Sequence, residues 1–434
     1  MNSDFVYLAL GSNLGNRKEN LKLAVEKLEL SAVKFVESSP IYSTPALLLK
    51  DSPDDWNKPF LNCIIKVKTE LKPLELLIIC KKIEFEIGRD FSKTWAPRPI
   101  DIDILFYKNQ QINLSNEAIK QNVSSELIEK YHIKNLIVPH EAFNKRYFLN
   151  DELSFIYPEI LKGFDYYNKE HQPIFMGILN ITPDSFSDGG KFNNIDNFKN
   201  TFELWENENV GIIDIGAEST NPKAKTIEYT EELDRLSFVF DYLKNKNFSY
   251  FRSMLSIDTY HYETAKETIK NGFDIINDVS GLKDERMLDL LKDSNAKYIL
   301  THSITIPPSQ DYVINDLSDI ENWLEEKLEL FEKNNISKNR IYFDAGIGFG
   351  KTPIQNLKIL QNLDIFKKYG LKLLIGHSRK GFLKVFNENF KTPDVDTLAI
   401  SLKIADKVDI LRVHTPIEHQ NALLVERSLN NQYI

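Results

Sequence analysis

The sequence predicts two domains, an α+β domain of the ferredoxin-like type followed by a (β/α)8 TIM barrel. The chain has 434 residues, more than one ordinary hydrophobic core encloses. Residues 5–107 show the order strand, helix, strand, strand, helix, strand, and after Pro173 the pattern changes to eight short apolar runs, each followed by a helical pattern. We therefore expect a first domain at residues 1–161, a linker at 162–173 and a barrel at 174–434.

The first domain has the element order typical of an antiparallel sheet covered by helices on one side. Connections longer than about 15 residues are usually functional lids or disordered insertions. Two such connections interrupt this domain, Pro45–Pro59 and the polar stretch Asn109–Asn135, and we assign no function to the second. The expected elements are strand Phe5–Ser12, helix Asn16–Leu30, strand Val33–Thr44, strand Phe60–Leu71, helix Pro73–Ile87 and strand Ile100–Tyr107.

The second domain contains eight apolar runs of strand length, which agrees with a (β/α)8 barrel of about 250 residues. The expected strands are Ile174–Ile181, Val210–Gly216, Met254–Asp258, Asp274–Asp278, Tyr298–His302, Ile341–Gly346, Lys372–Gly376 and Ile410–His414.

Composition restricts the classes of function. The net charge of −9 argues against a nucleic-acid interface, which needs a basic face. No apolar run approaches the roughly 20 residues that span a bilayer, and the N-terminus lacks a signal-peptide pattern. Cys63 and Cys80 lie in apolar runs and lack metal-ligand spacing, so we expect buried thiols outside any disulfide. We expect a reduced, cytoplasmic setting without membrane or nucleic-acid partners.

Polar residues close nearly every expected barrel strand, at the end where such barrels carry their reactive groups. Any one of them is more often structural than catalytic, but their convergence predicts a polar site. In chain order they are Asn180, Glu218-Ser219-Thr220, Asp258, Asn277-Asp278, His302, Asp344, Ser378-Arg379-Lys380 and Arg412-Val413-His414.

Asp101 and Asp103 lie two residues apart on an expected strand, so both side chains point to one face. Two neighbouring carboxylates repel each other unless a cation lies between them. A solvated outer face is the alternative interpretation. The chain has no GxxxxGK[ST] phosphate loop, so ordinary nucleotide-binding folds do not compete.

The barrel resembles dihydropteroate synthases, on motifs spread over its whole length. These are MGILNITPDSFSDGG (176–190), GAESTNP (216–222), SIDT (256–259), INDVSG (276–281), DAGIGFGK (344–351) and SRKG (378–381). A pterin edge offers N–H donors beside one carbonyl, so it needs carboxylate and amide acceptors and one cation.

The resemblance assigns roles to the residues of these motifs. Asp258, Asn277 and Asp344 would accept from the pterin, and Lys380 would face its carbonyl. Asn180, Arg412 and His414 match the family's anion- and Mg²⁺-binding positions, Asn180 as the metal position. Asp258, Lys380 and Arg412 are the expected catalytic residues. The mobile loops over p-aminobenzoate would be Ser187–Gly190 and Thr220–Lys225, and the expected contacts beside that substrate are Phe186, Thr220 and Pro222.

The first domain resembles 6-hydroxymethyl-dihydropterin pyrophosphokinases across residues 7–161. The motifs are YLALGSNLGNR (7–17), YSTPA (42–46), FLN (60–62), WAPRPIDIDILFY (95–107) and VPH (138–140). This resemblance implies that Asp101 and Asp103 hold Mg²⁺ ions that bridge ATP phosphates, with Arg98 also catalytic. The expected nucleotide contacts are Arg89, Trp95, Arg98, His140 and Arg146. The expected pterin pocket is Thr44, Pro45, Phe60, Asn62 and Phe148.

The sequence departs from these patterns at two places. Phe91 and Ser92 stand where relatives of the kinase often carry another basic residue, so the alignment of Arg89 is the least secure. Asn221 stands where relatives of the synthase usually carry Arg, and Lys223 or Lys225 could replace that charge.

We therefore expect a bifunctional enzyme with two consecutive steps. ATP would pyrophosphorylate 6-hydroxymethyl-7,8-dihydropterin, and the product would condense with p-aminobenzoate to give 7,8-dihydropteroate. The expected partners are these small molecules, with a homodimer through the barrel. Two alternatives stay open: a protein with only one active domain, the other serving as a scaffold, and a pterin-binding methyltransferase barrel.

Overall fold

The computed structural model describes residues 4–93, 95–140, 147–156, 171–182, 194–218, 226–303, 305, 314–386 and 391–430. The chain forms two compact units. We call them the first unit, composed of Met1–Glu170 with Phe248–Arg252 and Leu423–Ile434, and the barrel unit, composed of His171–Asn247 and Ser253–Ala422.

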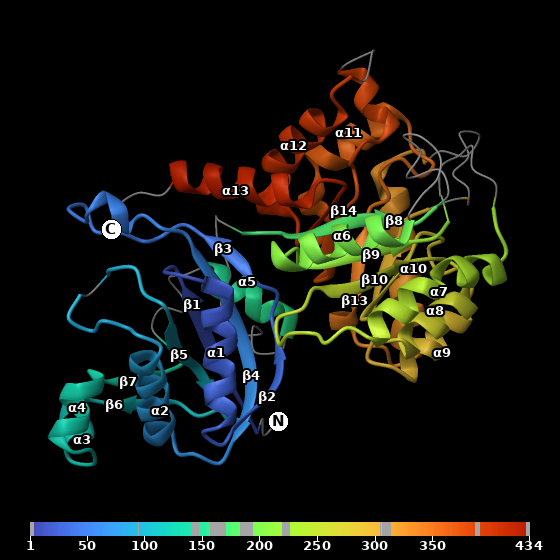
Figure 1. Cartoon of the computed structure of the whole chain (residues 1–434). Helices are drawn as coiled ribbons and strands as arrows, with labels where there is room; N and C mark the ends of the chain where they lie inside the picture. The colour runs from blue at the N-terminus through green and yellow to red at the C-terminus, as the bar shows by residue number, and fades with distance from the viewer. Residues whose placement is uncertain are drawn as a thin grey trace. The chain divides into compact units, whose positions relative to one another are not determined.

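The first unit has an antiparallel sheet in the order β2-β4-β1-β5, with β3 paired to β4 (Figure 1). This is the predicted ferredoxin-like order. The expected strand at Val33–Thr44 is divided into two strands, with Pro40 between them, a residue that donates no ladder hydrogen bond. The strands are β1 (Phe5–Ser12), β2 (Val33–Ser38), β3 (Tyr42–Thr44), β4 (Phe60–Thr69) and β5 (Asp101–Tyr107).

The two faces of this sheet are buried by different helices. Helices α1 (Arg17–Glu29) and α2 (Pro73–Glu86) cover one face, where Leu8, Leu28 and Ile102 contribute to the core. On the other face, helix α5 (Tyr147–Ile156) packs Leu149 and Leu153 on Tyr7 and Leu105. Asp101 and Asp103 alternate with the buried Ile100, Ile102 and Ile104, so both carboxylates lie on the face opposite α1 and α2.

The segment Asn109–Asn135 contains regular structure, so it is not a disordered insertion, one of the two possibilities expected for it. It contains strand β6 (Ile112–Leu114) and two short helices, α3 (Asn116–Lys120) and α4 (Ser125–Tyr131), and β6 pairs with β7 (Leu136–Val138). Ser115 Oγ accepts from Ala118 N at 3.3 Å, and Ser124 Oγ accepts from Leu127 N at 3.4 Å. These serine caps start the helices, and Ile119, Val123 and Tyr131 join the core of the first unit.

The barrel unit contains eight parallel strands that close in the order β8 to β15, as predicted. They are β8 (Ile174–Asn180), β9 (Ile212–Gly216), β10 (Met254–Asp258), β11 (Ile275–Asp278), β12 (Lys297–Thr301), β13 (Ile341–Asp344), β14 (Lys372–Ile375) and β15 (Ile410–Val413).

Helices follow the barrel strands and cover the outside of the barrel, except that the last of them belongs to the first unit from Leu423 onward (Figure 1). They are α6 (Asn194–Asn207), α7 (Tyr229–Lys244), α8 (Tyr262–Lys270), α9 (Arg286–Lys292), α10 (Leu317–Lys333), α11 (Pro353–Gln361), α12 (Pro393–Ile404) and α13 (Pro416–Asn430). Within the described part of the chain, no helix is both long enough and apolar enough to cross a membrane. Cys63 and Cys80 are buried thiols, as predicted.

Gly177 in β8 sets how closely helix α6 approaches the barrel. A Cβ at residue 177 would lie 2.5, 2.7 and 2.9 Å from three ring atoms of Trp205, which is itself buried. The indole therefore packs directly on the strand that ends at Asn180.

We expect Gly177→Ala to destabilise the barrel by about 1–3 kcal/mol, because the added methyl overpacks the contact with Trp205. Equilibrium urea unfolding of the full chain measures this change. Gly381→Ala is the matched control, since a Cβ there meets nothing within 4 Å. Equal unfolding midpoints for the two variants would contradict the prediction.

Candidate active sites

In the first unit, basic side chains surround Asp101 and Asp103. Arg89 Nη1 donates to Asp101 Oδ1 in a short contact, and Arg98 Nη1 lies 3.4 Å from Asp101 Oδ2. Asp103 Oδ1 lies 3.9 Å from His140 Nε2 and 4.0 Å from Lys81 Nζ. This arrangement combines two carboxylates with cations that can contact the phosphates of a nucleotide.

Glu84 of α2 binds two of these basic side chains, and the sequence analysis did not predict it. The Glu84 carboxylate is fully buried and accepts from Arg89 Nη1 at 2.6 Å, Lys81 Nζ at 2.8 Å and Ile102 N at 2.7 Å. Burial raises the pKa of Glu84, while Lys81 and Arg89 oppose that rise. The available signal was a carboxylate on the apolar face of α2, beside Cys80 and Ile83.

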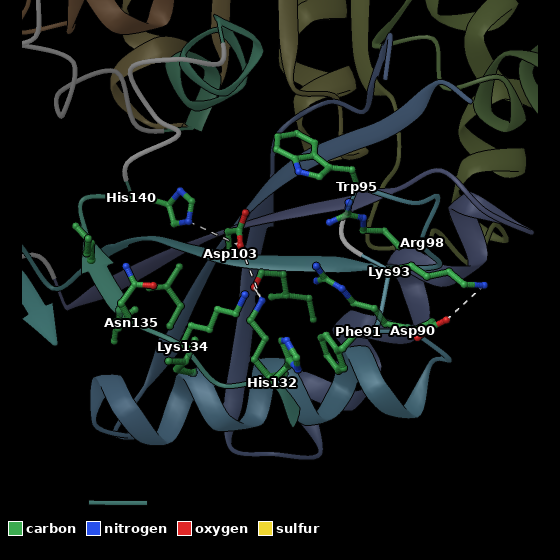
Figure 2. A pocket seen from close by; sticks show the side chains of 17 residues that line it. Asp90, Phe91, Lys93, Trp95, Arg98, Asp103, His132, Lys134, Asn135 and His140 are labelled. Carbon is green, nitrogen blue, oxygen red and sulfur yellow. Dashed lines mark hydrogen bonds and ion pairs between the residues drawn. The ribbon is translucent and has the colours of Figure 1, made fainter. Parts of the chain in front are cut away.

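Two cavities meet at the aspartates. The larger, of about 390 Å³, is lined by Arg89, Lys81 and His140, among others (Figure 2). The smaller, of about 70 Å³, is lined by four of the five residues expected to contact pterin, which are Thr44, Pro45, Phe60 and Asn62. Both cavities are lined by Trp95, Arg98 and Asp103. Asp103 therefore borders both a large charged cavity and a small, mostly apolar one, and Asp101 lines the smaller.

The sheet register builds the smaller cavity. Gly11 in β1 pairs with Asn62 on one side and with Asp101 on the other. A Cβ at Gly11 would lie 2.9 Å from Asn62 Oδ1, so glycine leaves room for that amide. Asn62 Nδ2 in turn donates to Thr44 Oγ1 at 2.7 Å.

In the barrel unit, the guanidinium of Arg412 lies between two carboxylates. Its Nε donates to Asp214 Oδ2 at 2.7 Å and its Nη2 to Asp258 Oδ2 at 2.6 Å. Asn277 Nδ2 donates to the same Asp214 oxygen at 3.1 Å. Asp214 is completely buried, and it is a second residue that sequence reasoning missed. It lies inside the apolar run IIDIG, where a charge on a buried strand was the available signal.

Asp344 and Lys380 complete the charges at this end of the barrel. Burial lowers the pKa of Lys380 to about 8, against the opposing effect of Asp344. Burial raises the pKa of Asp344, and it raises that of Asp258 to about 7 despite the nearby guanidinium. Oδ1 of Asp258 is buried and has no hydrogen-bond partner among the described residues. That oxygen can accept from a bound donor.

Other expected strand-end residues have partners of their own. His414 Nδ1 lies 2.8 Å from Ser378 Oγ, and burial lowers the pKa of His414 to about 3, so the imidazole is neutral. The Asn180 side chain faces Gly216, where a Cβ would lie 3.0 Å from Asn180 Oδ1.

His302 is part of the support of the β13–α11 loop. Lys351 Nζ lies 2.8 Å from His302 Nδ1 and donates to Gly346 O and Phe349 O at 2.9 and 2.8 Å. Gly346 has a φ of +67°, and a Cβ there would lie 2.0 Å from His302 O. Only glycine fits this position.

Several expected site residues lie outside the described part of the chain. These are Arg146, Phe186, Thr220 and Pro222, together with Asn221, Lys223 and Lys225. The backbone of Phe148 belongs to α5, but its side chain is not among those described. No group of three or more His, Cys, Asp or Glu side chains that could hold a metal occurs among the described residues.

Comparison with known proteins places both sites in enzyme families. The family model of 7,8-dihydro-6-hydroxymethylpterin-pyrophosphokinase matches residues 7–158, and that of pterin binding enzyme matches residues 176–414. A folate synthesis bifunctional protein of Chlamydia muridarum is 36% identical over 438 residues, which cover 95% of each chain. A protein of the same name from Arabidopsis thaliana is 33% identical and covers 96% of this chain and 94% of its own length.

Solved structures agree with these sequence matches. A dihydropteroate synthase of Clostridium difficile, crystallised in the presence of pteroic acid, matches with a TM-score of 0.54 and 33% identity. It covers 62% of this chain and 100% of its own. The bifunctional protein of Plasmodium falciparum covers 99% of this chain with a TM-score of 0.53; at 24% identity it shows the fold alone.

We expect Asp214→Ala to lower the free energy of unfolding by about 3–5 kcal/mol, because it removes one partner of a buried ion pair. The matched control is Asp364→Ala, which removes an exposed carboxylate 3.0 Å from Lys407 Nζ and should cost about 0–1 kcal/mol. Urea unfolding of both variants measures the difference. A loss for Asp214→Ala no larger than that of its control would contradict this account of Arg412.

Proposed function

This chain belongs to the family of bifunctional folate synthesis proteins, and we propose specific roles in that chemistry for the charged side chains of its two sites. The first unit transfers pyrophosphate from ATP to 6-hydroxymethyl-7,8-dihydropterin. The barrel unit joins the product to p-aminobenzoate and forms 7,8-dihydropteroate and pyrophosphate. The observation that carries the assignment of roles is the position of Asp103 and Arg98 in the lining of both cavities of the first unit.

In this proposal the larger cavity binds ATP and the smaller one binds the pterin. The pterin hydroxyl then meets the β-phosphate at the wall the cavities share. Arg89, Arg98 and His140 contact phosphate oxygens, with Arg146 as a further contact from the sequence. Transfer of this kind needs alignment and charge stabilisation more than acid–base help.

Magnesium is the expected companion of ATP here. Asp101 and Asp103 fit it, because Mg²⁺ prefers oxygen ligands and commonly takes only one or two carboxylates plus substrate phosphates. The carboxylates lie on one face, Asp101 beside Arg89 and Asp103 beside Lys81, and phosphate can engage these cations instead. When bound, the ion would neutralise charge on the transferred phosphates.

The pterin pocket of the first unit is proposed from shape and chemistry. Asn62 and Thr44 offer amide and hydroxyl groups to the edge of the flat ring system, and Pro45 supplies apolar surface. Phe60 and Phe148 are the aromatic residues proposed to stack on its faces. Trp95 would border the pterin and the nucleotide, since it lines both cavities.

In the barrel unit, Asp258, Asn277 and Asp344 are proposed to accept from the N–H groups of the pterin, and Lys380 to donate to its carbonyl. Oδ1 of Asp258, which has no hydrogen-bond partner within the described part of the chain, supports this role. Arg412 opposes the effect of burial on the pKa of Asp258, and it also faces the departing pyrophosphate. Neutral His414 and the amide of Asn180 would contact the pyrophosphate or its metal ion. Loss of pyrophosphate leaves a positive pterin methylene, which the amine of p-aminobenzoate attacks.

The p-aminobenzoate contacts rest on the sequence. Phe186, Thr220 and Pro222 are proposed to line the site of this substrate. No observation favours a protein with only one active domain or a pterin-binding methyltransferase barrel. The acidic pair of the first unit and the Asp258–Arg412 pair of the barrel are both in place.

The organisation of the chain supports three further proposals. We propose 1–161 as the kinase, 162–173 as the linker and 174–434 as the synthase. A homodimer through the barrel is supported by the exposed apolar side chains of Phe386 and Val395, and sedimentation velocity of the full chain tests it. A reduced, cytoplasmic setting is consistent with two buried thiols.

One coupled assay tests the two activities together. Purified protein is incubated with ATP, Mg²⁺, 6-hydroxymethyl-7,8-dihydropterin and labelled p-aminobenzoate, and labelled dihydropteroate is counted. Omission of ATP should abolish the product, and supplied pterin pyrophosphate should restore it. Product formation that does not need ATP would contradict the proposed order.

We expect Asp101→Ala and Asp103→Ala each to abolish AMP formation, because either change removes an oxygen ligand of the proposed metal ion. Dihydropteroate formation from supplied pterin pyrophosphate should be unchanged, which controls for folding. Excess EDTA should reproduce the loss of AMP formation in the unmodified protein. Normal kinase turnover in both variants would remove these residues from the metal site.

We also expect the barrel reaction to weaken as pH rises through about 8, the pKa to which burial lowers Lys380. Above that pH the side chain is a neutral amine and no longer supplies a cation to the pterin carbonyl. Initial rates of dihydropteroate formation across the neutral and alkaline range measure the effect. Lys380→Arg keeps its charge and should move the alkaline limb upward; an unmoved limb would assign the titration to another group.

A further inference from the structure

We propose that His132, together with Phe91, forms a stacking surface for the purine base of the nucleotide, so that the insertion Asn109–Asn135 completes the ATP site. This inference rests on the proposed function of the larger cavity of the first unit. It gives a role to this segment, which the two reactions described above do not otherwise use.

The two rings have the geometry of a stacking pair. The planes of Phe91 and His132 are inclined by only 3°, and their centroids lie 6.0 Å apart. Both residues line the larger cavity, and in Figure 2 the rings lie next to each other, apart from Trp95 and His140. Flat aromatic surfaces bind any base through its π-face.

The backbone of His132 is fixed by the insertion. His132 ends α4 in the left-handed conformation, with φ 52° and ψ 42°, and its N–H bonds to Ile128 O. On either side, Tyr131 packs edge-on against Phe85 of α2 with centroids 5.6 Å apart, and Ile133 N donates to Ile128 O at 3.1 Å. The imidazole is therefore presented from a rigid turn while its ring stays exposed.

The chemistry of the cavity separates a phosphate part from a base part. Arg98 and Asp103 occupy the part shared with the pterin cavity, and Arg89 lines the larger cavity beside them. Elsewhere the lining includes apolar side chains, among them Leu77, Leu136 and Ile137. A volume of about 390 Å³ falls within the range of roughly 300–1,000 Å³ typical of ligand sites. Phe91 adds an aromatic ring to this lining.

The guanidinium of Arg89 joins the two parts. Its carbon lies 5.1 Å from the centroid of Phe91, while its Nη1 contacts Asp101. One residue thus contacts both the proposed base surface and the acidic pair, which fits one ligand with a flat end and an anionic end.

The decisive experiment compares His132→Ala, His132→Phe and the unmodified full-length enzyme. We expect His132→Ala to raise the KM for ATP roughly fivefold to 150-fold, which corresponds to about 1–3 kcal/mol of base stacking. His132→Phe should keep the KM near its original value. The KM for the pterin and the barrel reaction should not change. Lys130→Ala, on the same helix, is the matched control.

A second measurement separates the base from the phosphates. Inorganic tripolyphosphate has no base, so its affinity, measured by competition with ATP, should be equal in the unmodified enzyme and in His132→Ala. An equal loss for tripolyphosphate and ATP would make His132 a phosphate contact and overturn the proposal.

The remaining outcomes are also distinct. An unchanged KM for ATP in an active His132→Ala enzyme overturns the base surface alone, whereas an unmodified protein that forms no AMP overturns the kinase assignment as well. If His132→Ala lowers the unfolding midpoint, His132→Gln takes the place of His132→Ala in the comparison of KM values for ATP. Stacking then requires that Phe preserves the KM for ATP and Gln does not; equal values for Phe and Gln overturn the proposal.

Discussion

The guanidinium of Arg412 lies between the carboxylates of Asp214 and Asp258, and the active end of the barrel depends on this arrangement. A buried carboxylate is costly unless a cation and hydrogen bonds compensate for lost water. Three different strands supply these three residues, so the buried carboxylates gain their cation only when the barrel closes. Asn277, Asp344 and Lys380 are then arranged around a core that is already compensated.

The first unit applies the same rule to a different fold. Glu84 takes the role of Asp214: it is fully buried, contacts no proposed substrate, and holds Arg89 and Lys81 beside the acidic pair. In both units a residue behind the site fixes a cation, and the cation fixes the carboxylates in front. Such preorganisation reduces the rearrangement that charged substrates require.

The sequence was sufficient for much of this because the signals were periodic. Alternation placed Asp101 and Asp103 on one face, and the eight apolar runs corresponded to the eight barrel strands. Asp214 and Glu84 were missed because a single charge within an apolar run has no period. The partners of Asp214 also lie far away in the chain, at Asn277 and Arg412. The insertion was misjudged for a related reason: its helices are short and polar, and their stability comes from serine caps and from packing on α2 that no local pattern encodes.

The β13–α11 loop has a consequence for how this protein can evolve. Any side chain at residue 346 would collide with the carbonyl of His302, and that carbonyl also accepts from Lys351. Gly346, Lys351 and His302 therefore depend on one another, and a substitution at one of them would disturb the other two. Resistance to compounds that compete for the barrel site should therefore arise from substitutions elsewhere along its rim. The β13–α11 loop should stay constant.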